Sequence, residues 1–305
     1  LAWGAVASVL EGPTEADGFT WYRLEADDGA TGWAAAGDAE DDWLVPVLVP
    51  SEADLRIQVS SACDVVGPLA TPDTTVLEDG LVVTSTFSGG YVAGVLSAEG
   101  MGSLETEILS NPYLQQDGDY VPVPRAGAGE PPGHGACTYT FVVGSGDNPV
   151  RVSSVSWFGD AEESQFWEPA PERRALTQIA QSLSDIESVL PSTAWTAEPL
   201  PYVAENYVMW LIAESGPMAG SFVEIADLNL AASADAFGDA VTDISRCGVL
   251  SREQARRVHA GLRAAGFESG LAGFVGGPMR DGDSGYSLLI APQTPVGEPG
   301  CDGLR

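Results

Sequence analysis

The stretch from Gly18 to Ala34 constrains the fold of this chain more than any other segment. It predicts two short strands joined by a turn, with Trp21 and Tyr22 on the first strand and Trp33 on the second. Because side chains alternate across a strand, Trp21 and Tyr22 point to opposite faces, and one of them should face solvent. The sequence therefore predicts a small β-structure with large aromatic rings near the start of the chain.

The order of motifs in residues 1–50 resembles a known module. Gly12-Pro13 marks a turn, G-x-x-WY-x-L begins at Gly18, DG-x-x-GW follows, and a strand at Trp43 ends at Pro46. This order resembles the second half of a bacterial Src-homology-3-type (SH3-like) domain, a small β-barrel of secreted and cell-envelope proteins that acts as a binding module. The resemblance implies a partial barrel over residues 1–50 that binds cell-wall peptide or glycan. Since the barrel pattern begins midway, we expect Leu1 to lie inside a longer precursor or at a trimmed edge.

Beyond a proline-containing linker, the chain repeats the order strand, strand, helix. Strands are expected at 81–87 and 91–96 with a helix at about 104–110, and a Gly- and Pro-rich loop spans 117–136. Strands then follow at 138–143 and 150–157, a helix runs from Pro171 to Pro191, and an apolar strand covers 206–213. The fold class is α+β: a partial SH3-like barrel, then antiparallel sheet with helices. We place domains at 1–50, 54–215 and 216–305, the last packed on the preceding one.

The C-terminal part contains one well-marked helix. Ser251 is the expected N-cap, Gln254 completes a capping box, and the helix ends at Gly266. A closing strand is expected at 286–291.

A second resemblance rests on four short patterns. They are DG-x-V-V at 79–83, E-R-x-x-L-x-x-x-A-x-x-L at 172–183, R-C-G-V-L at 246–250 and L-x-x-x-P-x-x-P at 288–295. Together they are similar to uncharacterised secreted proteins or lipoproteins of high-GC bacteria. This resemblance implies an extracytoplasmic compartment and disulfide bonds, and it implies no activity.

The four cysteines are even in number and far apart, without a Cys-x-x-Cys pair, so a zinc site is not indicated. We favour the pairs Cys63–Cys137 and Cys247–Cys301, which form one of three possible connectivities. Disulfides would place the protein in an oxidising, extracytoplasmic compartment, whereas buried free thiols are the alternative.

The charge of the chain excludes several classes of partner. It has 44 acidic residues against 13 basic ones, all of them arginine, and its net charge is −31. Such a charge repels nucleic acid and anionic membrane surfaces, so neither is an expected partner. The acidic surface would attract cations or basic polymers, or would simply keep the protein soluble. Adaptation of the protein to a high-salt habitat is a further explanation for its acidity. No apolar run reaches the roughly 18 to 20 residues that a membrane-spanning helix needs.

The only catalytic pattern is Gly282-Asp283-Ser284-Gly285, which matches the start of the nucleophile motif of trypsin-like proteases. His134, 150 positions before Ser284, would be its base. Tyr286 replaces the expected Gly-Pro, and His134 lies in a loop, so the motif is incomplete. His259 is expected to be a partly exposed residue on the flank of the capped helix. We therefore predict no enzyme, and no catalytic, cofactor-binding or metal-ligating residues.

Aromatic residues supply the candidate binding sites. In the N-terminal module Tyr22 and Trp33 are ligand-binding candidates, or else complete the core, while Trp21 and Trp43 are expected in the core. Trp157 and Trp167 bracket an acidic turn and either cover a second core or bind a partner.

The sequence thus favours a non-enzymatic, extracytoplasmic binding protein of the cell envelope. Its partner would be cell-wall peptide, glycan or an envelope protein. A secreted hydrolase using Ser284 and a structural spacer without a ligand are the two alternatives.

Overall fold

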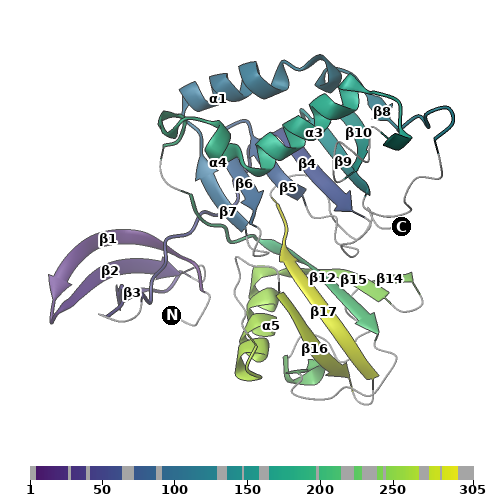
Figure 1. The fold of residues 1–305 in the computed structure, drawn as a ribbon. Helices are drawn as coiled ribbons and strands as arrows, with labels where there is room; N and C mark the ends of the chain where they lie inside the picture. Colours follow the sequence, from purple (N-terminus) through teal and green to yellow (C-terminus); the bar gives the residue numbers. More distant parts are fainter. Residues whose placement is uncertain are drawn as a thin grey trace.

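The computed structural model of the chain contains three β-sheets with helices on the two larger ones (Figure 1). It is therefore a mixed α+β protein, as the sequence predicted, and strands predominate over helices. The structure describes residues 5–26, 29–38, 42–63, 72–86, 91–128, 136–145, 148–157, 165–196, 199–213, 223–228, 239–242, 245–267, 275–281 and 284–294.

The first sheet is an antiparallel meander of three strands. It consists of β1 (Ala7–Ala16), β2 (Phe19–Ala26) and β3 (Thr31–Ala35), in the order β1-β2-β3. Asp17 and Gly18 turn the chain between β1 and β2 in the left-handed region, with φ of 55° and 82°. The predicted strands at Trp21 and Trp33 are confirmed, and β1 is an additional strand. Over residues 5–26, 29–38 and 42–63 this sheet stays open, so the expected barrel does not close within the described residues.

The second sheet has eight strands in the order β11-β7-β6-β5-β4-β9-β10-β8. All neighbours are antiparallel except β8 and β10, which run parallel. The strands are β4 (Leu55–Cys63), β5 (Pro72–Leu77), β6 (Leu81–Ser85), β7 (Tyr91–Val95), β8 (Gly118–Tyr120), β9 (Ala136–Val143), β10 (Val150–Trp157) and β11 (Leu200–Pro201). β8 lies in the segment that was expected to be a loop.

Helices cover one face of this sheet (Figure 1). They are α1 (Ala98–Leu104), a π-helical turn (Glu105–Leu109), α3 (Pro171–Ser184) and α4 (Ile186–Val189), with 3-10 turns at Pro112–Leu114 and Ser192–Ala194. α1 begins earlier than predicted because the Ser97 hydroxyl accepts a hydrogen bond from the Gly100 N–H. Leu104 of α1 and Leu176 of α3 are buried in one core with Ile57 and Phe141 of the sheet.

The third sheet has six strands in the order β13-β16-β17-β12-β15-β14. The strands are β12 (Asn206–Ala213), β13 (Val223–Glu224), β14 (Asp239–Thr242), β15 (Ser245–Ser251), β16 (Val275–Asp281) and β17 (Ser284–Pro292), and a 3-10 turn spans Ile225–Leu228. Helix α5 (Arg252–Ala264) packs against β12 and β15, and it has the predicted capping box of Ser251 and Gln254. β12, placed at the end of the 54–215 domain, pairs with β15 and β17 of this sheet.

The two larger sheets and α5 share a second hydrophobic core, which lies on the face of the eight-stranded sheet opposite α1, α3 and α4. It joins Leu77 and Val83 of the eight-stranded sheet to Met209 and Ile290 of the six-stranded sheet. Hydrogen bonds cross the same boundary: Tyr202 donates to the Gln293 carbonyl at 3.2 Å. Val6, Val47 and Leu48 pack against this core, and they connect the N-terminal sheet to it.

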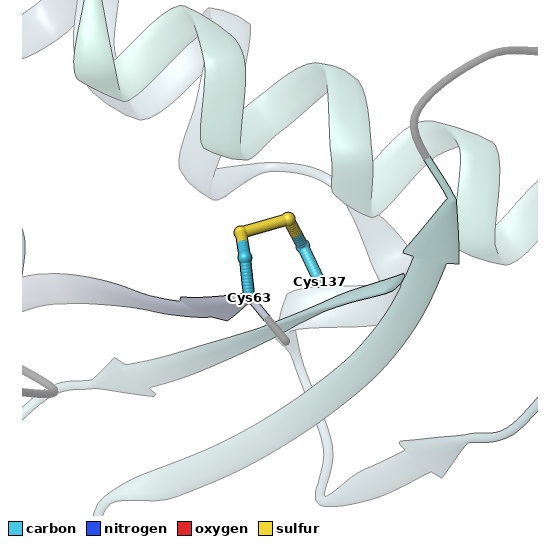
Figure 2. The surroundings of a disulfide bond; sticks show 2 residues. All are labelled: Cys63 and Cys137. Atoms are coloured by element: carbon cyan, nitrogen blue, oxygen red, sulfur yellow. A yellow bond between two sulfur atoms is a disulfide. The ribbon is translucent and has the colours of Figure 1, made fainter. Parts of the chain in front are cut away.

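A disulfide joins Cys63 to Cys137, as predicted (Figure 2). The two residues lie directly opposite each other on β4 and β9, at the end of the eight-stranded sheet. Cys247 is also disulfide-bonded, and its predicted partner Cys301 lies outside the described residues. None of the helices in the described ranges is both long enough and apolar enough to cross a bilayer.

Candidate functional site

The N-terminal sheet buries very little of its own surface. Within β1, β2 and β3, Leu24 is the one buried side chain, and almost all of β1 is exposed. Several exposed large apolar residues of the chain belong to this module: Val9, Leu10, Trp33, Trp43, Val45 and Val49. Exposed large apolar side chains that serve no core are candidates for contact with a partner. This module is therefore the first candidate site.

Strand register assigns these side chains to two faces. Residues directly opposite in an antiparallel pair share a face, and Trp33 lies opposite Arg23, which lies opposite Glu11. By alternation along β2, Phe19 and Trp21 belong to this same face. Tyr22 and Leu24 belong to the other face. Trp21 and Tyr22 thus lie on opposite faces of the sheet, as predicted. We call the face that carries Phe19, Trp21, Arg23 and Trp33 the aromatic face.

Ring contacts organise part of the aromatic face. Phe19 packs edge-on against Trp21 with 6.3 Å between ring centroids, and its centroid lies 6.0 Å from that of Trp43. The Trp21 Nε1 donates to the Ala16 carbonyl at 3.0 Å, which fixes the indole. Trp21 is half-buried, but Trp43 is 55% exposed, so its expected place in a core is wrong. The reason is that the sheet stays open in the described residues and provides no interior for this ring.

Trp33 and Tyr22 differ in accessibility. Trp33 lies in the middle of β3 and is 48% exposed, as a ligand-binding residue requires. Tyr22 is half-buried on the opposite face, and its ring approaches the backbone of Gly12. Gly12 has φ of +125°, and a Cβ there would lie 2.8 Å from the Trp21 carbonyl oxygen and 3.0 Å from the Tyr22 ring. Tyr22 therefore packs on the bend of β1, whereas Trp33 is available to a ligand.

The second aromatic cluster, around Trp157 and Trp167, does not form an exposed surface within the described residues. Trp167 is buried, with 8% exposure, and its backbone forms an isolated bridge with Pro124. This burial favours the alternative in which Trp167 covers a core. Trp157 ends β10 opposite Ala136, and its side chain lies outside the described residues, as do Phe158 and the acidic turn.

The described residues do not bring a histidine to Ser284. Ser284 is exposed at the start of β17, while His134, Gly282 and Asp283 lie outside the described residues. His259 is buried and meets Tyr207 with 6.1 Å between ring centroids, so its expected partial exposure is wrong. Burial lowers the pKa of His259 to about 4, which keeps the imidazole neutral. His259 is also far from Ser284. Its neighbour Tyr207 pairs with Pro292, which lies eight residues from Ser284 along β17, a distance of roughly 26 Å at about 3.3 Å per residue.

A polar cluster that no sequence pattern predicted lies at the end of the eight-stranded sheet. Asp73 lies at an irregularity between β4 and β5, and its carboxylate accepts hydrogen bonds from the side chain and backbone of Ser61. Burial raises the pKa of Asp73 to about 6, and burial with the nearby Asp73 charge raises the pKa of Tyr139. Ser154 is buried nearby in register, opposite Tyr139. No local pattern signals this cluster, because the bulge that places Asp73 depends on the pairing of two strands.

Within the described ranges, no group of three or more metal-ligating side chains could hold a metal ion. Comparisons of the chain with protein-family models, curated proteins and solved structures find no match.

Proposed function

We propose that this protein is an extracytoplasmic binding protein of the cell envelope, and that its N-terminal sheet binds a cell-wall peptide or glycan. The observation that carries the proposal is the exposure of Trp33 on a sheet that buries only Leu24, together with the exposure of Trp43, which lies in a bend rather than the predicted strand and packs beside Phe19 of that sheet. Exposed rings that are not needed for a core offer flat, rigid, apolar surfaces at a low cost in conformational entropy.

Two further features support this proposal. The Cys63–Cys137 disulfide fits a protein that works in an oxidising compartment, such as the cell surface. The two larger sheets share one hydrophobic core, so together they can serve as a base for the smaller module. Val6, Val47 and Leu48 connect the module to this base, and the side chains of β3 remain exposed or half-buried.

Co-sedimentation with isolated cell-wall material tests the proposal. The full chain should sediment with the wall, and a Trp33→Ala, Trp43→Ala variant should bind at least tenfold more weakly. The matched control is Val121→Ala, Val123→Ala, which removes two apolar side chains of 58% and 60% exposure from the larger part of the chain. This control should bind like the wild type. Equal sedimentation of all three proteins, or no sedimentation of the wild type, would overturn the proposal.

A further inference from the structure

The two edges of the N-terminal sheet are not equivalent. β1 shows register shifts between Val9 and Glu11 and between Glu11 and Thr14, and it contains Pro13, which lacks a backbone N–H. Bulges and proline are the usual means by which proteins block an edge strand. β3 pairs with β2 in continuous register from Thr31 to Ala35 and contains no proline. Among the described residues β2 is its only partner strand, and the chain turns back only after β3, where Trp43 and Leu44 donate to the Ala36 carbonyl; within the described part of the chain the outer edge of β3 is therefore the open one.

Trp33 lies at the centre of this open edge strand. On β2 its opposite residue is Arg23, and its diagonal neighbours on the same face are Trp21 and Glu25. Arg23 lies 3.8 Å from a carboxylate oxygen of Glu11, which compensates the arginine charge. A strand added along β3 would therefore place every second side chain on the aromatic face, beside Trp33.

The charge around β3 selects the sign of the ligand. Residues 1–50 contain ten acidic residues and one arginine, so their formal charge is 1 − 10 = −9. Asp27 and Asp28 precede β3 in the chain, and Asp38 follows it. A net charge of −31 for the whole chain adds to this field. An anionic ligand would be repelled, and a neutral ligand would gain nothing from the field.

We infer that β3 accepts an extended, positively charged peptide as an added strand, with a basic side chain over Trp33. This inference rests on the proposed function and assigns the ligand of the module to the peptide class. Backbone hydrogen bonds to the open edge supply affinity that is independent of side chains, as in other complexes formed by strand addition. The attraction between a cation and the indole, together with the net negative charge of residues 1–50, then selects lysine or arginine.

The test uses the full-length chain and a fluorescein-labelled octapeptide of alternating lysine and threonine, titrated by fluorescence anisotropy. The lysine peptide should bind, and its glutamate counterpart should not. Raising the salt from about 0.01 M to about 1 M, which shortens the Debye length from about 30 Å to about 3 Å, should weaken binding strongly. N-methylation of alternate residues should abolish binding in one frame and spare it in the other, because only one set of N–H groups faces β3.

Protein variants locate the site. Trp33→Ala should weaken lysine-peptide binding by about tenfold, and Trp33→Phe should restore part of the loss because a ring is retained. Leu10→Ala removes an exposed apolar side chain from the other edge strand and should leave binding unchanged. Circular dichroism would verify that each variant retains its fold. Equal effects of Leu10→Ala and Trp33→Ala would overturn the inference, as would tolerance of N-methylation in both frames.

The two proposals fail in different ways. If cell-wall sedimentation depends on Trp33 and Trp43 but the lysine peptide does not bind, the proposed function stands and the ligand is a glycan. If the peptide binds along β3 but sedimentation is unaffected by the same variants, the strand-addition site is real and the cell-wall proposal fails. A neutral oligosaccharide, chitohexaose, that competes with the wall while the lysine peptide does not would also overturn the peptide assignment.

Discussion

Replacing Asp73 with asparagine should stabilise the protein at neutral pH and not at acidic pH. The carboxyl group is half-buried, and burial raises its pKa from the ordinary 3.8 to about 6, against hydrogen bonds from Ser61 that lower it. Asparagine keeps the shape of the side chain and an oxygen acceptor for Ser61, but it carries no charge. The substitution therefore isolates the cost of burying the ionised form.

The sign follows from the direction of the pKa change. A group whose pKa is raised in the folded state contributes stability that is fully present below the unfolded pKa, here 3.8, and is lost as the pH rises through about 6. Each pKa unit corresponds to about 1.36 kcal/mol, so a pKa raised by about 2 lowers the free energy of unfolding by about 3 kcal/mol once the group is ionised. The free energy of unfolding of Asp73→Asn, relative to the wild type, should thus increase by up to about 3 kcal/mol between about pH 3.5 and about pH 8.

Urea unfolding of both proteins across this pH range measures the difference. The other acidic residues are the same in both chains, so their titration largely cancels in the comparison. Asp54→Asn is the matched control: it removes one exposed carboxylate and reports the small gain expected from lowering the net negative charge. A pH-independent offset for Asp73→Asn, or a loss of stability near pH 8, would refute the argument that burial controls this carboxyl group.

Three further predictions concern stability. Replacing Cys63 and Cys137 with serine should lower the free energy of unfolding by about 2 to 4 kcal/mol, because the bond closes a loop of sequence separation 74; unchanged urea unfolding would contradict this. Ser154→Ala should leave the free energy of unfolding unchanged or raise it by about 1 kcal/mol, since the buried hydroxyl has no hydrogen-bond partner among the described residues. A clear decrease in melting temperature would show that the hydroxyl does have a hydrogen-bond partner. Ser251→Ala should cost about 1 kcal/mol through loss of the N-cap of α5, whereas Ser251→Asn should retain most of the stability.

Local signals explain which parts of the fold were predictable from sequence. α5 was found from a capping box and an apolar stripe, and both features act within one helix. The hairpin of β2 and β3 was found from alternation and turn residues close together in the chain. β12 was found as an apolar strand, but its membership of the six-stranded sheet depends on pairing with residues about 40 and 80 positions later, which no local pattern reports.

The candidate site was only partly predictable for the same reason. Alternation correctly separated Trp21 from Tyr22, because it requires only a strand. Whether Trp43 is covered depends on closure of the sheet, and in the described residues the sheet stays open. His259 lies beside the apolar stripe of α5 in sequence, yet the packing of α5 against β12 buries it. Periodicity gives the face of an element, and the neighbouring elements decide what that face meets.

The arginines show how the chain distributes its charge. Arg56 contacts Glu78 and Glu105, Arg256 and Arg257 contact Glu253, and Arg280 contacts Glu224. Arg173 and Arg252 donate to backbone carbonyls. These described arginines thus interact within the molecule, and the 13 arginines of the chain offset only 13 of its 44 acidic charges. Exposed ion pairs add little stability, so this arrangement mainly sets the sign of the external field. A field of that sign would favour the basic peptide that we propose as an added strand along β3, beside Trp33.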